Sequence, residues 1–257
     1  MVMGKQETGN DYAPFRDELS EANIDSSGYF SRITTFENNP DLVIRIRKQK
    51  SYNYFSKIQG VNVLAVNRCE LLKLEKHGLT LPRFMSVLGA IGKLNPVTYF
   101  IITDRIYGVD LRQLRYSELS QDELANATKQ IDTSFTGIAS YLHERSRKSG
   151  WYIADASYNV RHTQFMYGRR RGETESRVYY VDLGPTLQYY SVDDISFPDY
   201  YEVAVRDLYY LISSTERRLN SVLDDSRVTL SALLLDLYPK SWWLKELINS
   251  EGRFLRL

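Results

Sequence analysis

The order of strand-like and helix-like segments along the chain is the feature that most limits its possible fold. In the first part, apolar runs of strand length surround one helical pattern at 63–77, which Gly78 ends. The second part is dominated by a long amphipathic pattern at 120–146, which Ser120 and Glu123 open with the spacing of a capping box. A chain ordered in this way predicts an α+β fold in which a strand-rich part precedes a helical part.

The remaining elements follow from the same patterns. Short apolar or alternating runs bounded by turn residues predict strands, and the polar turn at 169–175 predicts a hairpin in the second part. The expected strands are 28–35, 42–47, 83–88, 97–103, 151–154, 164–168 and 177–182, and the further expected helices are 200–220, 230–237 and 241–249.

Composition places the chain among ordinary globular proteins. Its 257 residues are 43% apolar and 25% charged, which suits one mid-sized domain or two small lobes that share a cleft. The 33 basic and 32 acidic residues give a formal charge of +1, so the chain as a whole does not attract nucleic acid or an acidic membrane. We therefore expect neither of these among its partners.

The sequence shows no sign of secretion or of membrane insertion. Cys69 is the only cysteine and cannot form an internal disulfide, which suits a reducing compartment. Residues 1–14 are polar and charged, without the apolar run of a signal peptide, and the longest apolar stretches, such as 97–103, are too short to cross a bilayer. The expectation is a cytoplasmic protein.

Asp182 is the first candidate for chemistry. It ends the strand pattern at 177–182 and stands in the segment Val181-Asp182-Leu183-Gly184. A carboxylate at a strand end can hold Mg²⁺ between phosphates, and a glycine two residues later lets the backbone turn away sharply. A tripeptide of this kind also arises by chance at an ordinary strand end, so its context decides between a metal ligand and a simple turn.

The residues upstream of Asp182 supply that context. Asp155 ends the segment Tyr152-Ile-Ala-Asp155, and Gln164 begins the segment Gln164-Phe-Met-Tyr167. With Asp182, this order resembles the catalytic loop and metal site of the protein-kinase-like superfamily, in particular its aminoglycoside and other small-molecule phosphotransferases and its atypical kinases. The resemblance implies that Asp155 is the catalytic base or orients the acceptor, and that Gln164 and Asp182 bind the metal.

The chain departs from the family pattern around Asp155. Ile153 and Ala154 precede it, where the family has His and then Arg or Gly, and Gln164 follows it at nine residues instead of five. The longer spacing leaves Asn159 as the alternative to Gln164, although no strand follows Asn159 directly. A further alternative is that the inserted residues shape a substrate pocket, and these include Arg161 and His162.

The strand-rich part contains candidate phosphate contacts. Gly28 lies in a segment that resembles a degenerate form of the glycine-rich loop that covers the nucleotide phosphates. The strand 42–47 resembles the family's third strand, with Arg45 in place of the lysine that grips phosphate, and arginine keeps the charge in a planar fork. Strand alternation puts Arg45 and Arg47 on one face and Lys48 on the other, so Lys48 is the rival phosphate contact.

The helix at 63–77 is expected to provide a carboxylate partner for one of these cations. Glu70 is the only acid in its first two turns, and it is expected to pair with Arg45 or Lys48. The spacing to the leucines that follow fits Asn67 slightly better than Glu70, so Asn67 is the alternative.

Two further segments resemble parts of the same superfamily. Residues 99–111 resemble the inter-lobe hinge, in which a Gly-x-x-Leu starts a helix, so backbone groups from Thr103 to Ile106 are expected to read the adenine edge. Residues 204–211 resemble the buried helix whose aspartate braces the catalytic loop, and Asp207 would be that residue; the alternative is an exposed helical acid.

Taken in order, these segments imply a two-lobed kinase-like fold. Residues 1–107 would form a β-rich N-lobe with one helix, with 1–22 as a leading segment, and 108–257 a mainly helical C-lobe with a β-hairpin. The implied cofactors are ATP and Mg²⁺. The implied partners are the nucleotide and an unidentified acceptor that is a small molecule or a protein, and the scaffold alternative implies a protein partner.

Three functions remain open from the sequence. The first is an ATP-dependent phosphotransferase, and the second is a pseudokinase that binds nucleotide or serves as a scaffold, which the single glycine at Gly28 and the arginine at Arg45 favour. The third is an α+β interaction protein that binds no nucleotide. The three histidines and one cysteine lack zinc-ligand spacing, and no Gly-x-Ser-x-Gly motif indicates a hydrolase.

Overall fold

The computed structural model describes residues 31–36, 39–47, 63–91, 94–145, 147–153, 156, 160–183, 187–191 and 197–223. Several sequence-based predictions lie outside these residues: Gly28, Lys48, Asp155, Asn159 and the expected helices 230–237 and 241–249.

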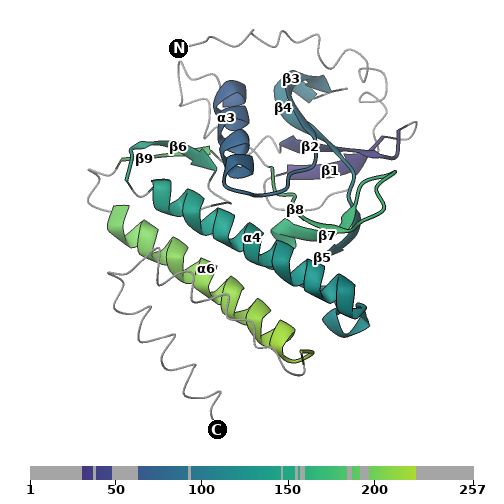
Figure 1. Ribbon diagram of the computed structural model, residues 1–257. Helices are drawn as coiled ribbons and strands as arrows, with labels where there is room; N and C mark the ends of the chain where they lie inside the picture. Colours follow the sequence, from purple (N-terminus) through teal and green to yellow (C-terminus); the bar gives the residue numbers. More distant parts are fainter. Residues whose placement is uncertain are drawn as a thin grey trace.

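A four-stranded antiparallel sheet forms the first part of the fold (Figure 1). Its strands are β1 (Ser31–Thr35), β2 (Leu42–Arg47), β3 (Phe84–Ile91) and β4 (Leu94–Asp104). They lie in the order β1-β2-β4-β3, so β2 and β4 are the central strands. All four were expected, and β3 and β4 extend beyond their expected bounds, to Ile91 and Leu94.

Helix α3 (Val63–Lys76) is the one helix among the described residues of the first part. Gly78 ends it with φ 95°, a left-handed conformation that glycine adopts without strain. The Leu79 amide donates to the Leu74 carbonyl at 3.1 Å and the Gly78 amide to the Glu75 carbonyl at 2.9 Å. These two bonds are those of a Schellman motif, and the buried Leu74 and Leu79 side chains complete it.

A second, three-stranded sheet connects the two parts. The expected hairpin consists of β7 (Phe165–Arg169) and β8 (Arg177–Tyr180), and β5 (Tyr107–Asp110) pairs with β7 on its other side. The sequence predicted that Gly108 would lead directly into a helix, and this was wrong. Gly108 lies opposite Gly168, and a Cβ on either would overlap the backbone of the other strand, so the two glycines permit a strand pairing here.

A third sheet has two strands. The expected strand β6 (Gly150–Ile153) pairs with β9 (Leu187–Tyr190), which the sequence did not predict. Strand β6 ends two residues before Asp155, so this pairing anchors the chain that enters the predicted catalytic loop.

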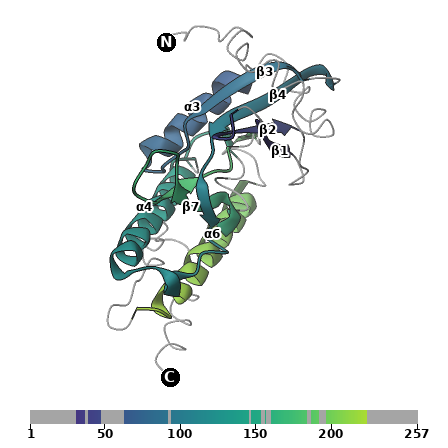
Figure 2. The same ribbon diagram turned by 90° about the vertical axis from the view of Figure 1, so that its right-hand side faces the viewer.

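The long helices α4 (Gln121–Arg145) and α6 (Phe197–Asn220) lie side by side below the sheets (Figures 1 and 2). Short 3-10 helices, η2 (Tyr116–Glu118) and η3 (His162–Gln164), precede α4 and β7. The predicted capping box is confirmed: Ser120 Oγ accepts the Glu123 amide at 3.3 Å, and Glu123 Oε2 accepts the Ser120 amide at 3.0 Å.

One buried cluster joins both parts of the fold. It contains Leu71 and Leu74 of α3 together with apolar side chains of α4, the hairpin and α6. At its centre, Phe165 makes edge-to-face contacts with Phe135 and Tyr180, with ring centroids 5.5 and 5.4 Å apart. The cluster therefore includes residues from both sides of the boundary predicted at 107 and 108.

The hairpin turn also contacts the first sheet through polar groups. Arg171 pairs with Asp41 at 2.6 Å, and the Tyr107 hydroxyl donates to the same carboxylate at 2.6 Å. The Tyr107 hydrogen bond, followed by that of Arg171, lowers the pKa of Asp41. Within the described residues, no helix combines the length and apolar character needed to span a membrane.

Candidate functional site

Gln164 and Asp182 lie together where the β7–β8 hairpin opens. Gln164 directly precedes β7, and Asp182 follows β8 by two residues. The Val181 amide donates to the Gln164 carbonyl at 2.8 Å, and the Tyr180 amide donates to the Thr80 carbonyl at 2.9 Å. These two bonds fix the C-terminal end of β8, one to the hairpin and one to the segment after α3. The position of Asp182 therefore depends on both.

Arg45 reaches the same place from the central strand β2. Its Nη1 forms an ion pair with Asp182 Oδ1, and its Nη2 donates to the Val181 carbonyl at 3.3 Å. The two side chains are 19% and 21% exposed, so the pair is shielded but still open to solvent. The predicted phosphate-binding residue and the predicted metal ligand, 137 positions apart, are thus in direct contact.

The Gln164 side chain contacts the other oxygen of the same carboxylate. Its Nε2 lies 3.4 Å from Asp182 Oδ2, and its Oε1 accepts the Arg161 amide at 2.7 Å. The amide oxygen is the side-chain atom of Gln164 that could bind a metal, and one of its two lone pairs already accepts the Arg161 amide. Gln164 therefore orients Asp182 here, and its oxygen keeps one lone pair for a metal.

The residues around Asp182 fit one type of metal site. Mg²⁺ is commonly held by one or two carboxylates together with substrate phosphates and water. Among the described residues, no three or more His, Cys, Asp or Glu side chains form a group that could hold a metal ion. A partly exposed single carboxylate next to an arginine suits a metal that arrives with a nucleotide.

Glu70 has partners other than the predicted ones. It accepts hydrogen bonds from the Tyr141 hydroxyl at 2.7 Å and from Arg145 Nη2 at 2.5 Å, and Lys73 Nζ lies 2.6 Å away. Arg45, one of its two expected partners, pairs with Asp182 instead. Glu70 thus joins α3 to the end of α4, where an arginine lies on the buried face of the helix.

Tyr141 extends this network toward the predicted catalytic loop. Its hydroxyl donates to Glu70 and accepts the Ile153 amide at 3.1 Å, and it is fully buried. Ile153 and Ala156 are buried on either side of Asp155 in the sequence. Burial, the Glu70 charge and the hydrogen bond to Glu70 raise the pKa of Tyr141 well above its ordinary value, so its hydroxyl keeps its proton.

Tyr141 and Arg145 were not predicted from the sequence, although a signal for Arg145 was present. The buried positions of α4 recur every three or four residues and include Ile138, Leu142 and Arg145. A charged residue within an apolar stripe indicates a buried partner, because an unpaired buried charge is costly. Asn67, the alternative to Glu70, is fully buried, and its amide has no hydrogen-bond partner among the described residues.

The hinge-like segment has fewer free backbone donors than expected. The Asp104 amide donates to the Arg83 carbonyl at 3.0 Å, and the Arg105 amide donates to the Asp41 carbonyl at 2.7 Å. Thr103 pairs with strands on both sides, and the side chain of Ile106 is buried. A role for Thr103 and Ile106 in reading an adenine edge stays a prediction.

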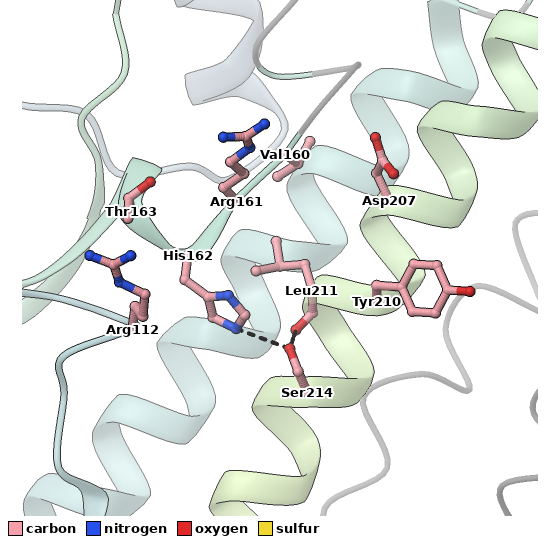
Figure 3. A pocket seen from close by; sticks show the side chains of 9 residues that line it. All are labelled: Arg112, Val160, Arg161, His162, Thr163, Asp207, Tyr210, Leu211 and Ser214. Atoms are coloured by element: carbon pink, nitrogen blue, oxygen red, sulfur yellow. Dashed lines mark hydrogen bonds between the residues drawn. The ribbon is translucent and has the colours of Figure 1, made fainter. Parts of the chain in front are cut away.

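Asp207 lies on α6 beside a pocket that is separate from the Asp182 carboxylate (Figure 3). The residue is neither fully exposed nor buried. The loop that it was expected to brace includes Asp155 and lies largely outside the described residues, so the bracing role stays a prediction.

His162 lines the same pocket and gives a testable pH dependence. Burial and then the charges of Arg218 and Arg112 lower its pKa, which Asp110 raises in part. The unfolded chain accepts the proton at an ordinary pKa of about 6.5, so folding stability falls as the pH drops through that value. We expect His162→Gln, measured by thermal unfolding from pH 8 to 5, to lose less stability than the wild type. An identical pH profile for the two proteins would contradict this.

Comparisons with known proteins give a likeness of fold. No protein-family model matches the chain, and no curated protein matches it. Among solved structures, the Rio2 kinase from Chaetomium thermophilum is similar at 13% identity, over 96% of this chain and 76% of that chain, with a TM-score of 0.44. WaaP in complex with acyl carrier protein is similar at 14% identity, over 95% of this chain and 98% of that chain, with a TM-score of 0.39. At these TM-scores the similarity says nothing about function.

The chain's own elements define its class. Among the described residues, a β-sheet with one helix precedes two long helices, and in the sequence between these helices a hairpin ends two residues before Asp182. This is the α+β, protein-kinase-like arrangement predicted from the sequence, and the predicted fold class is confirmed.

Proposed function

We propose that this protein is an ATP-dependent phosphotransferase that acts on a hydroxyl group. The observation that carries the proposal is the meeting of Arg45, Gln164 and Asp182 at the open end of the hairpin. Each residue was selected from a different sequence segment as a phosphate or metal contact. A guanidinium and a carboxylate that solvent can still reach are the groups that contact a triphosphate and its cation.

The roles follow from the chemistry of each group. Mg²⁺ bound at Asp182 would neutralise charge on the phosphates. Arg45 would exchange Asp182 for phosphate oxygens, which its planar fork can contact with two N–H groups. The acceptor oxygen would bond to the γ-phosphorus while the bond to the β–γ bridging oxygen breaks, so that ADP leaves, and Asp155 would accept the hydroxyl proton. Gly28, Thr103 and Ile106 would line the nucleotide.

A pseudokinase is the second candidate, and a specific observation favours it. Arg45 already neutralises Asp182, and one lone pair of the Gln164 oxygen is engaged by the Arg161 amide. If these bonds persist, the site holds a nucleotide without a metal, or no nucleotide at all. The two candidates differ in whether binding requires Mg²⁺.

The test is the thermal stability of the protein with ATP or ADP, each with and without Mg²⁺. We expect ATP to raise the melting temperature more strongly with Mg²⁺ than without it, because a ligand that binds only the folded state stabilises it. Asp182→Asn keeps the shape of the side chain and removes its charge, and it should abolish the Mg²⁺-dependent part of the shift.

Asp132→Asn is the matched control, since Asp132 is exposed on α4. It should respond to ATP as the wild type does. A nucleotide shift that is independent of Mg²⁺ and survives Asp182→Asn would favour the pseudokinase. No shift in the wild type would reject the phosphotransferase and leave a pseudokinase scaffold that binds no nucleotide.

A further inference from the structure

A pocket of about 480 Å³ lies between α6 and the segment that leads into β7. Its lining comes from three places: Arg112 after β5, residues 160–163, and one face of α6 from Asp207 to Ser214. Figure 3 shows Arg161 and Asp207 around its upper part and Arg112 and His162 lower, towards its base, whereas Tyr210 points away from them. The volume suits a small molecule and is too small for a folded partner.

The pocket wall is rich in cationic groups. Arg112 and Arg161 both line it, and both are exposed side chains. Arg218 lies behind it and is fixed by a bond to the Leu111 carbonyl at 2.6 Å. Its charge and that of Arg112 act on His162, and the Asp110 carboxylate partly offsets them there. An anionic group is the ligand feature that such a wall favours.

The same wall also contains groups that suit hydroxyls. The hydroxyls of Ser214 and Thr215 donate to the Leu211 carbonyl at 3.0 and 2.8 Å, and each oxygen lies 3.1 Å from His162 Nε2. Because the hydroxyl protons are already used, Nε2 carries the proton in these contacts. Thr163 and Asp207 add a hydroxyl and a carboxylate, and the carboxylate can accept from a ligand hydroxyl.

A single turn of chain connects the pocket to the Asp182 site. The 3-10 helix η3 carries His162 and Thr163 on the pocket side, and the next residue, Gln164, contacts Asp182. The Arg161 amide donates to Gln164 Oε1 at 2.7 Å, which ties a pocket residue directly to the side chain that orients Asp182. A ligand in the pocket therefore lies one turn of chain away from the predicted metal ligand.

We propose that this pocket holds the acceptor, and that the acceptor is a small polyhydroxylated anion such as a sugar phosphate. Its anionic group contacts Arg112 and Arg161, and its hydroxyls contact Asp207 and the polar groups at the base. The assignment of this ligand as the acceptor rests on the proposed phosphotransferase function, whereas the binding of the anion does not.

Calorimetric titration with glucose 6-phosphate, inorganic phosphate and glucose tests the proposal. We expect glucose 6-phosphate to bind at least about tenfold more tightly than glucose, because glucose lacks the anionic group. The double variant Arg112→Gln/Arg161→Gln should lose this preference. The control double variant Arg115→Gln/Arg177→Gln removes two exposed arginines outside the pocket and should retain it.

A second measurement avoids substitution altogether. The imidazole resonances of His162 in the wild type, followed by NMR at constant pH, should shift on addition of either phosphate probe, because His162 lines the pocket. Equal affinity for glucose and glucose 6-phosphate, a preference that survives in the Arg112/Arg161 variant, or His162 resonances that do not respond to glucose 6-phosphate would each overturn the proposal.

Failure of the pocket proposal can be distinguished from failure of the proposed phosphotransferase function. The nucleotide-dependent thermal shift is measured on the same proteins, and it depends on Asp182 rather than on Arg112. If glucose 6-phosphate binds as expected but ATP gives no shift, the pocket stands and the phosphotransferase proposal fails. If ATP binds but the phosphate probes do not, the phosphotransferase proposal stands and this acceptor class is wrong.

Discussion

Replacing Glu70 with alanine is expected to lower the free energy of unfolding by about 3–5 kcal/mol, as measured by urea denaturation. Glu70 is 3% exposed and Arg145 is 7% exposed, so the guanidinium would remain buried without its carboxylate. The Tyr141 hydroxyl would lose its acceptor at the same time. An effect of this size is a large part of the total stability of an ordinary domain.

Glu75→Ala is the matched control for this prediction. Glu75 lies on the same helix but is exposed, so its replacement should change stability by no more than about 0.5 kcal/mol. Tyr141→Phe should be intermediate, because it removes one hydrogen bond to the carboxylate and the acceptor of the Ile153 amide. A Glu70→Ala protein as stable as the control would show that Arg145 reaches water.

Replacing Arg45 with methionine is expected to weaken ATP binding about 10- to 100-fold, while adenosine binding stays unchanged. A hydrogen bond to a charged group contributes about 1.5–3 kcal/mol, which corresponds to this range. Methionine keeps the apolar stem of the side chain and removes only the guanidinium. Competition titration against a fluorescent nucleotide measures both affinities on one protein.

Arg83→Met serves as the control, because Arg83 is exposed and pairs with Asp104 rather than Asp182. If ATP affinity is unchanged in Arg45→Met, then Arg45 does not contact phosphate. Lys48→Met would then test the rival residue in the same assay. Equal losses for ATP and adenosine would instead indicate a disturbed fold.

Local patterns accounted for most of the secondary structure. The helix predicted at 63–77 and the one at 120–146 each match the observed bounds within a residue, because Gly78 and the Ser120–Glu123 box set their ends through bonds to nearby backbone. Strand 42–47 was predicted with the same bounds. These signals operate over a few residues and do not depend on what packs against them.

Strands without a local pattern were missed. Strand β5 contains Gly108, which weakens any strand signal, and its pairing depends on Gly168, sixty positions away. Strand β9 is four residues long and gains its ladder only by meeting β6. In both cases the partner strand, rather than the segment itself, makes the extended conformation favourable.

The candidate site likewise has features that the sequence predicted and features that it did not. Asp182 and its place at the end of a hairpin were readable from the sequence, because a strand pattern, an aspartate and a glycine are all local. The choice of partner was not readable: Arg45 pairs with Asp182, and Glu70 pairs with Arg145. Several cations lay within plausible reach of each carboxylate, and only packing selects among them.

The sequence by itself therefore determined the class of fold, the order of its elements and the aspartate around which we propose a site. The tertiary structure decided which atoms face Asp182: a guanidinium on one oxygen and the nitrogen of Gln164 on the other. It also placed His162 and Arg161 in a pocket with Asp207 of α6. The physical reason is that backbone patterns act locally, whereas ion pairs and cavities arise between segments that only the folded chain brings together.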